Sequence, residues 1–125
     1  MSKSRILVVD DNPTNAKLMR AVLVPQGYEV HTALDATAAM ASIATARPDL
    51  ILMDLQLPGV DGLELTRRLK ADPGTAPIPV LAVTAYAMRG DEERALAAGC
   101  DGYMTKPIDS HALRGRVKEL LGVTE

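Results

Sequence analysis

The chain has 125 residues, 47% of them hydrophobic and 24% charged, with a formal net charge of −2 at pH 7. This balance predicts one soluble globular domain, spanning residues 1–125, that is long enough to bury a genuine core. The sequence has no basic run of the kind that binds a phosphate backbone, and no apolar stretch near the roughly 20 residues that cross a bilayer. Neither a nucleic acid nor a membrane is therefore an expected partner.

The amino terminus and the cysteine content predict the compartment. Residues 1–5 lead directly into an apolar run, which leaves no room for a signal peptide. Cys100 is the only cysteine, so an internal disulfide is excluded and a reducing environment fits. We expect a cytoplasmic protein.

Short apolar runs alternate along the chain with segments of helical length. Short apolar runs bounded by turn residues are typical of buried parallel strands. In chain order, we expect a strand at 6–9, a helix from Asn12–Pro13 to about Val24, a strand at 29–33, a helix at 36–45, a strand at 50–53 and a loop at 57–62. These are followed by a helix at 63–70, a strand at 80–83, a helix from Asp91 to Gly99, a strand at 103–104 and a last helix. The last helix is capped by Asp109 or Ser110 and carries Leu113, Val117, Leu120 and Leu121 inward. This is a strand–helix unit repeated five times, and right-handed crossovers would place helices on both faces of the sheet.

Polar residues follow four of the expected strands. Asp10 and Asp11 follow the first strand, Asp54 the third, Thr84 the fourth and Lys106 the last. Ligands of open parallel sheets bind at the carboxyl ends of the strands, so these side chains are expected to converge on one edge. Such a pocket suits a divalent cation and a phosphoryl group.

Three carboxylates at one edge need a counter-charge. They repel one another unless a cation intervenes or one of them stays protonated. Hard oxygen ligands with several retained waters favour Mg²⁺. The alternative is that these aspartates only cap helices or close turns. That is common for any one aspartate after a strand, and far less so for all three beside Thr84 and Lys106.

Asp54 is the candidate nucleophile. A carboxylate can form an aspartyl-phosphate intermediate, and phosphoryl transfer needs mainly positioning and charge neutralisation. Lys106 can neutralise phosphoryl oxygens, and Thr84 can donate a hydrogen bond to one of them. The Lys106–Pro107 bond is a candidate cis peptide.

Asp10–Asp11, Asp54 with the loop 57–62 (Leu-Pro-Gly-Val-Asp-Gly), Thr84–Ala85 and Lys106–Pro107 resemble the receiver domain of two-component response regulators. The resemblance covers essentially the whole chain in one register. It implies an α/β, doubly wound fold: a five-stranded parallel sheet of order 2-1-3-4-5 with five helices.

The resemblance also implies a phosphoacceptor and a metal site. Asp54 resembles the acceptor of the phosphoryl group. Asp11, Asp54 and the backbone carbonyl of Gln56 resemble direct Mg²⁺ ligands, with Asp10 acting through a metal-bound water.

Further roles follow from the same resemblance. Thr84 and Tyr103 resemble the switch pair, in which the hydroxyl moves to the phosphoryl group and the ring turns inward behind it. Lys106 would pair with the phosphate, and Pro107 would be cis.

These roles imply a response regulator. Only about four residues follow the last expected helix, so we expect it to stand alone, without an output domain. It would accept a phosphoryl group from a sensor histidine kinase or histidine phosphotransferase and then change its interaction with a downstream signalling protein. It would be no enzyme beyond catalysing its own phosphorylation and dephosphorylation. Residues 83–94 are similar to single-domain cell-cycle regulators of the DivK type, and also to receivers excised from hybrid histidine kinases.

Two other functions stay open. A Mg²⁺-dependent phosphohydrolase could use an aspartyl-phosphate intermediate, but such enzymes of the haloacid-dehalogenase type carry Asp-x-Asp after the first strand, and Asp10-Asp11-Asn12 does not match. A degenerate receiver could act as a constitutive interaction module, although the intact acidic set argues against it.

The remaining candidates are less specific. His31 and His111 have no partner at ligand spacing and are expected at the surface, while Cys100 is expected to be a small buried thiol. Leu18 either docks a kinase's histidine-bearing helices or belongs to a wide core face. Gln56 and Tyr86 are expected to line the mouth of the pocket. A further group forms either a partner surface or only a solvated face of mixed charge: Met88, Arg89, Tyr103, Arg114 and Lys118.

Overall fold

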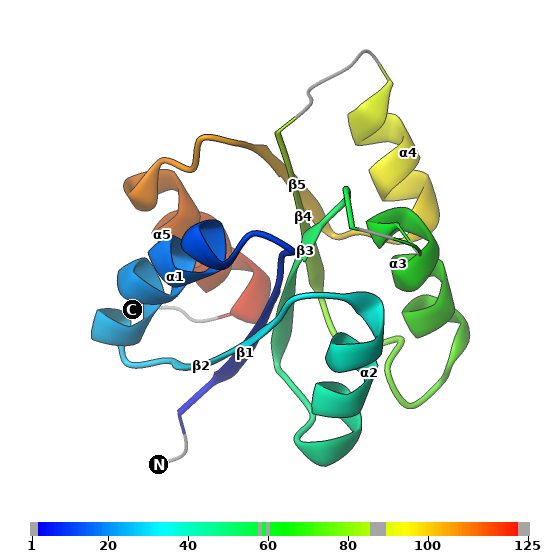
Figure 1. Cartoon of the computed structure of the whole chain (residues 1–125), viewed down its shortest axis with the longest axis horizontal. Helices are drawn as coiled ribbons and strands as arrows, with labels where there is room; N and C mark the ends of the chain where they lie inside the picture. The colour runs from blue at the N-terminus through cyan, green and yellow to red at the C-terminus, as the bar shows by residue number, and fades with distance from the viewer. Residues whose placement is uncertain (1–2, 58, 60, 86–89, 123–125) are drawn as a thin grey trace.

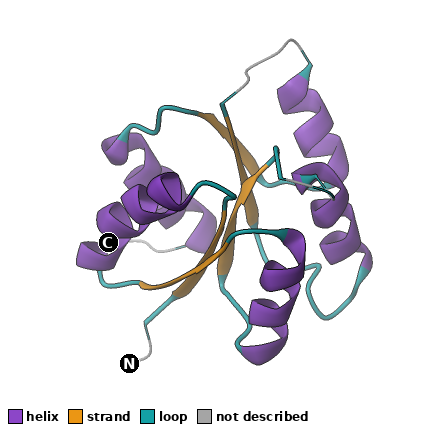
Figure 2. Ribbon diagram, viewed as in Figure 1, coloured by secondary structure: helices purple, strands orange, loops and turns teal. Residues whose placement is uncertain are grey.

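In the computed structural model, which describes residues 3–57, 59, 61–85 and 90–122, five parallel strands form one sheet with helices on both faces (Figures 1 and 2). The strands are β1 (Arg5–Val9), β2 (Glu29–Ala33), β3 (Leu50–Asp54), β4 (Val80–Thr84) and β5 (Gly102–Thr105). Their order is β2-β1-β3-β4-β5, which confirms the predicted doubly wound fold.

The helices begin and end close to the predicted residues. They are α1 (Pro13–Leu23), followed by a 3₁₀ turn η1 (Val24–Gln26), α2 (Ala36–Thr45), α3 (Gly62–Ala71), α4 (Asp91–Ala98) and α5 (Ser110–Leu121). Side-chain oxygens cap the first backbone N–H groups of four of them, from Asn12, Asp35, Asp61 and Asp109. α4 instead starts after Gly90, and three acidic residues in its first turn complement the helix dipole.

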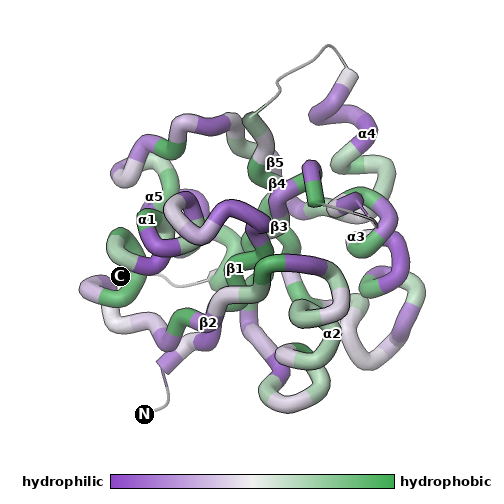
Figure 3. Tube along the Cα trace, in the orientation of Figure 1, coloured by the Kyte–Doolittle hydropathy of each residue, from purple (hydrophilic) through white to green (hydrophobic). Residues whose placement is uncertain are grey.

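The pleat of the strands divides the core into two clusters. On one face, Leu7 and Val9 pack with residues of α2, α3 and α4. On the other, Ile6 and Val8 pack with residues of α1 and α5. β3 and β4 are buried along their whole length, which is why they read as continuous apolar runs. Figure 3 shows this hydrophobic centre. Burying one large aliphatic side chain in it contributes about 1.5–3 kcal/mol to the free energy of unfolding.

α1 presents a wider apolar arc than the core covers. Met19 and Leu23 are buried, whereas Leu18 is 60% exposed. Of the two interpretations of Leu18, the structure therefore supports the one that leaves it outside the core. Among the described residues, every helix is too short or too polar to span a bilayer.

The two histidines and the cysteine lie where the sequence placed them. His31 on β2 and His111 on α5 are exposed, and Cys100 is buried with a free thiol. His31 lies 2.6 Å from Glu29 through its Nε2 atom, in an exposed pair at the edge of the sheet. Tyr86, Met88 and Arg89 lie outside the described residues.

Candidate metal and phosphoryl site

The carboxyl edge of the sheet brings together residues that are far apart in the sequence. Asp10 directly follows β1, and its backbone N–H bonds the Ala33 carbonyl at the end of β2 (3.0 Å). Asp54 ends β3, the strand beside β1. Lys106 follows β5, where its N–H bonds the Thr84 carbonyl (2.8 Å). Each side chain therefore starts from a rigid strand end.

The carboxylates of Asp10 and Asp54 are held in the same way. In each, Oδ1 accepts the backbone N–H two residues later, from Asn12 and from Gln56, at 2.9 Å. In each, Oδ2 faces the Lys106 ammonium, at 2.8 Å for Asp10 and 3.3 Å for Asp54. Lys106 thus bridges two almost fully buried acids and contacts Asp10 more closely.

Burial and charge oppose each other in this cluster. Burial raises the pKa of Asp54, and the nearby Asp10 adds to the shift, while the Gln56 N–H and Lys106 counteract it. Burial disfavours the charged form of Lys106, but the hydrogen bond to Asp10 and the charge of Asp54 outweigh it and raise the pKa of this lysine. Lys106 is therefore a fixed positive charge at neutral pH.

The residues fit a divalent cation. Carboxylate oxygens of Asp10, Asp11 and Asp54 all lie within 4.8 Å of one another. With all three ionised and Lys106 protonated, the formal charge is −3 + 1 = −2. Asp11 is exposed, so the cluster is open to water on one side. Hard oxygen donors with room for retained water suit Mg²⁺.

The other predicted site residues lie on, or just after, β3, β4 and β5. Thr84 ends β4 and is buried, and Gln56 is exposed just past Asp54. Tyr103 on β5 is half-buried against the core beneath α4; burial and the charges of Asp91 and Glu92 raise its pKa. The metal role of the Gln56 carbonyl stays a prediction.

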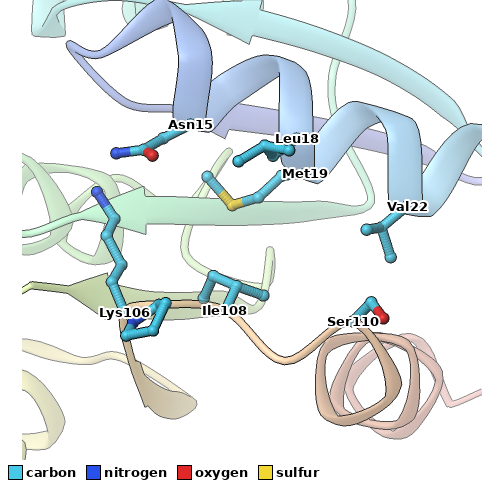
Figure 4. Close-up of a pocket in the computed structure, with 8 residues that line it drawn as sticks. Asn15, Leu18, Met19, Val22, Lys106, Ile108 and Ser110 are labelled. Carbon is cyan, nitrogen blue, oxygen red and sulfur yellow. The ribbon is translucent and has the colours of Figure 1, made fainter.

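The Lys106–Pro107 peptide bond is cis. It leads into one side of an apolar groove that the sequence did not reveal. The groove, with a volume of about 290 Å³, is lined by Asn15, Leu18, Met19, Val22, Lys106, Pro107, Ile108 and Ser110. Figure 4 shows Met19 and Val22 extending from α1 toward Ile108 and Ser110, with Lys106 at the end where Asn15 lies. No local pattern predicts such a groove, because its two walls are about 90 residues apart in the chain.

Gly62, the first residue of α3, is another feature of the site to which the sequence analysis gave no role of its own. A Cβ atom here would lie 2.3 Å from the carbonyl oxygen of Asp54. The signal was present as an Asp-Gly pair in the loop, but only the fold shows what the glycine approaches.

The family model described as response regulator receiver domain matches residues 6–118. The chain belongs to this family. Over 122 residues the receiver domain is 46% identical to the polar-differentiation response regulator DivK of Brucella anthropi, covering 98% of each protein. It is also 46% identical over 117 residues to the response regulator PleD of Caulobacter vibrioides, covering 94% of this chain but only 26% of PleD. The chain thus spans about a quarter of that relative.

The fold of the receiver domain is shared with solved structures. It matches the receiver domain of the sensor histidine kinase PA1611 from Pseudomonas aeruginosa PAO1 with a TM-score of 0.87 and 36% identity, covering 97% of this chain and 99% of that one. The PA1611 structure has a magnesium ion coordinated in its active site cleft.

Proposed function

We propose that this receiver domain accepts a phosphoryl group on Asp54 from the phosphohistidine of a sensor histidine kinase or histidine phosphotransferase, and then changes its affinity for a downstream signalling protein. The observation that carries the proposal is the Asp54 carboxylate, fixed at a strand end, paired with Lys106 and grouped with Asp10 and Asp11. The free, buried thiol of Cys100 is in keeping with a cytoplasmic setting.

The chain's own groups supply the nucleophile and much of the charge neutralisation. A carboxylate oxygen of Asp54 forms the new O–P bond, while the P–N bond of phosphohistidine breaks and the nitrogen keeps the electron pair. Lys106 contacts Asp10 at 2.8 Å and Asp54 at 3.3 Å, so it can stay with Asp10 and give its weaker contact to a phosphoryl oxygen. Because this cation is already held by Asp10, its charge can stabilise the transferring group with little reorganisation during the reaction.

Magnesium is the cofactor we propose for this site. Asp11, Asp54 and the Gln56 carbonyl would hold Mg²⁺, and Asp10 would act through a bound water. When bound, the ion neutralises the carboxylates and the phosphoryl oxygens. The ion in the PA1611 receiver domain supports this assignment, as does the oxygen donor set here.

Thr84 and Tyr103 are the proposed switch pair. Thr84 lies at the end of β4, next to the strand that carries Asp54, and Tyr103 lies on the neighbouring β5. The Thr84 hydroxyl would bond the phosphoryl group, and the Tyr103 ring would turn further into the core beneath α4. Phosphorylation would then shift the population between two arrangements of this side of the domain.

The test is incubation with Mg²⁺ and acetyl phosphate, followed by the intact mass of the protein. We expect one phosphoryl group per chain. Steady turnover of p-nitrophenyl phosphate without a stoichiometric modification would instead favour a phosphohydrolase. No addition to the folded protein from either acetyl phosphate or a phosphohistidine donor would favour a constitutive interaction module.

Magnesium should raise the melting temperature. Binding only the native state at about ten times the dissociation constant stabilises a protein by about 1.4 kcal/mol, or roughly 5 °C for a domain of this size. Differential scanning fluorimetry with and without Mg²⁺ measures the shift. Asp11→Asn should lose most of it, whereas Asp35→Asn, a matched change at the cap of α2, should keep it. An equal shift in both variants would place the ion elsewhere.

We propose that the groove between α1 and the segment after β5 receives the helix that carries the phosphohistidine. The groove opens beside Lys106, and Leu18 is an exposed apolar residue on its α1 wall. An amphipathic helix packs its apolar side into a groove of this kind.

Leu18→Arg should slow transfer from a phosphohistidine protein by tenfold or more, because a charge replaces apolar contact at the centre of the interface; one lost hot-spot contact is worth about 1–2 kcal/mol or more. Phosphorylation by acetyl phosphate should not change, because this small donor needs no docking. Leu96→Arg, at another exposed leucine on α4, is the matched control and should affect neither donor. A Leu18→Arg protein that accepts phosphate from both donors normally would move the docking surface elsewhere.

A further inference from the structure

α3 starts in direct contact with the main chain of the phosphoacceptor. The Gly62 N–H donates to the Leu55 carbonyl at 3.1 Å. A Cβ atom on Gly62 would be 2.3 Å from the Asp54 carbonyl oxygen and 2.7 Å from the Leu55 Cα atom. No side chain cushions this contact, so a displacement of the first turn of α3 must pass into the turn at residues 54–56.

Thr66 is hydrogen-bonded to the first turn of α3. Its side chain is fully buried, and its hydroxyl donates to the Gly62 carbonyl at 2.7 Å. The buried Cys100 thiol lies 3.8 Å from the same hydroxyl oxygen, as a donor. A threonine hydroxyl bonded to the carbonyl four residues earlier tilts that carbonyl and bends the helix. Thr66 therefore affects where Gly62 lies, and Cys100 contacts the Thr66 hydroxyl from the other side.

The turn that Gly62 touches also orients the acceptor. Gln56 donates its backbone N–H to Oδ1 of Asp54 at 2.9 Å, which leaves Oδ2 facing Lys106. A continuous line of contacts thus runs from Cys100 through Thr66 and Gly62 to the carboxylate of Asp54.

We propose that Thr66 is a positioning residue for Asp54, acting through Gly62 and the turn at residues 54–56. Packing alone does not call for a hydroxyl here, because Thr66 is fully buried on the helix that supplies the core residues Leu65 and Leu69, and valine has nearly the same shape. A hydroxyl costs free energy to bury unless it is bonded, and here both its donor and acceptor functions are used. The proposal rests on the function proposed above for Asp54.

The experiment compares Thr66→Val, which removes the hydroxyl, with Thr66→Ser, which keeps it. The control is Thr75→Val, because the Thr75 hydroxyl also bonds an α3 carbonyl, that of Leu69 at 2.6 Å, but at the far end of the helix. Two quantities are measured at a temperature where every variant is folded. One is the rate of phosphorylation by acetyl phosphate at saturating Mg²⁺, and the other is the position of the Gln56 amide resonance in a ¹⁵N–¹H spectrum.

We expect Thr66→Val to react about tenfold more slowly, since a misplacement well below 1 Å has a cost of this order. We also expect it to shift the Gln56 amide. Thr66→Ser should stay within about twofold of wild type in rate, and Thr75→Val should change neither quantity even if its melting temperature falls.

A normal rate with an unmoved Gln56 amide in Thr66→Val would overturn the proposal. So would an equal effect in Thr75→Val, which would show a general loss of α3 stability. If Thr66→Val does not fold, Thr66→Ser decides, since a slow reaction or a shifted amide in a protein that keeps the hydroxyl contradicts the proposal. If wild type takes up no phosphate, the proposed function fails, while the Gln56 amide still tests the positioning.

Discussion

Asp54→Asn should take up no phosphoryl group and should fold normally. An amide is not a nucleophile, whereas its oxygen can still accept the Gln56 N–H that holds the side chain. Lys106 loses one charged partner but keeps the closer one, Asp10 at 2.8 Å. Intact mass after incubation with acetyl phosphate and Mg²⁺ measures the uptake. Asp109→Asn, at the cap of α5, should be modified like wild type, because asparagine caps a helix equally well.

The stability of Asp54→Asn should depend on pH in a defined direction when Mg²⁺ is removed. Burial raises the pKa of Asp54, so the folded protein holds this proton more tightly than the unfolded chain does. Ionised Asp54 therefore lowers the free energy of unfolding. This cost grows as the pH rises from the pKa that Asp54 has in the unfolded chain to its higher pKa in the folded protein. Asparagine removes it, so urea unfolding should find the variant at least as stable as wild type at neutral pH and show a smaller advantage in acid. Uptake by Asp54→Asn, or its collapse at neutral pH, would contradict the proposed role of this residue.

Gly62→Ala should be strongly destabilised and should lose most of its phosphoryl uptake. The added methyl group would stand 2.3 Å from the Asp54 carbonyl oxygen, and the obstructing atoms are backbone that cannot rotate away. Overpacking of this kind costs about 1–3 kcal/mol, and relieving it means moving either α3 or the turn that carries Asp54. The midpoint of urea unfolding measures the first effect, and the rate of phosphorylation per folded molecule measures the second.

Gly115→Ala is the matched control for this substitution. Gly115 lies inside α5, and a Cβ atom there would meet nothing within 4 Å. Alanine should therefore stabilise the domain by about 0.5–1 kcal/mol and leave uptake unchanged. If Gly62→Ala matched wild type in both stability and rate, α3 would have to lie farther from β3 than the structure places it.

The secondary structure could be predicted from the sequence because its causes are local. The strand order could be predicted because the chain resembles a family of known fold. β3 and β4 are buried on both faces, so every residue of each strand is apolar until its last, and that run is visible without the fold. Helix starts were visible because caps such as Asn12 and Asp109 act within three residues. The strand order itself came from the resemblance to receiver domains and not from the periodicity.

The candidate site was likewise predictable as a set of residues. Parallel strands end at a common edge, so Asp10, Asp54 and Lys106 had to lie near one another once the strands were assigned. The sequence by itself therefore determined which chemical groups meet.

The tertiary structure decided how these groups meet. Lys106 is 96 positions from Asp10, and its closer contact with Asp10 than with Asp54 depends on the exact placement of three strands. A periodic pattern shows which side of a helix faces the core, but it does not show how close the helix lies to the neighbouring strands. For that reason, only the fold shows that Gly62 touches the main chain of Asp54 and that Leu18 stays exposed beside a groove. Distances between segments remote in sequence are set by packing of the whole core, which no local window of residues contains.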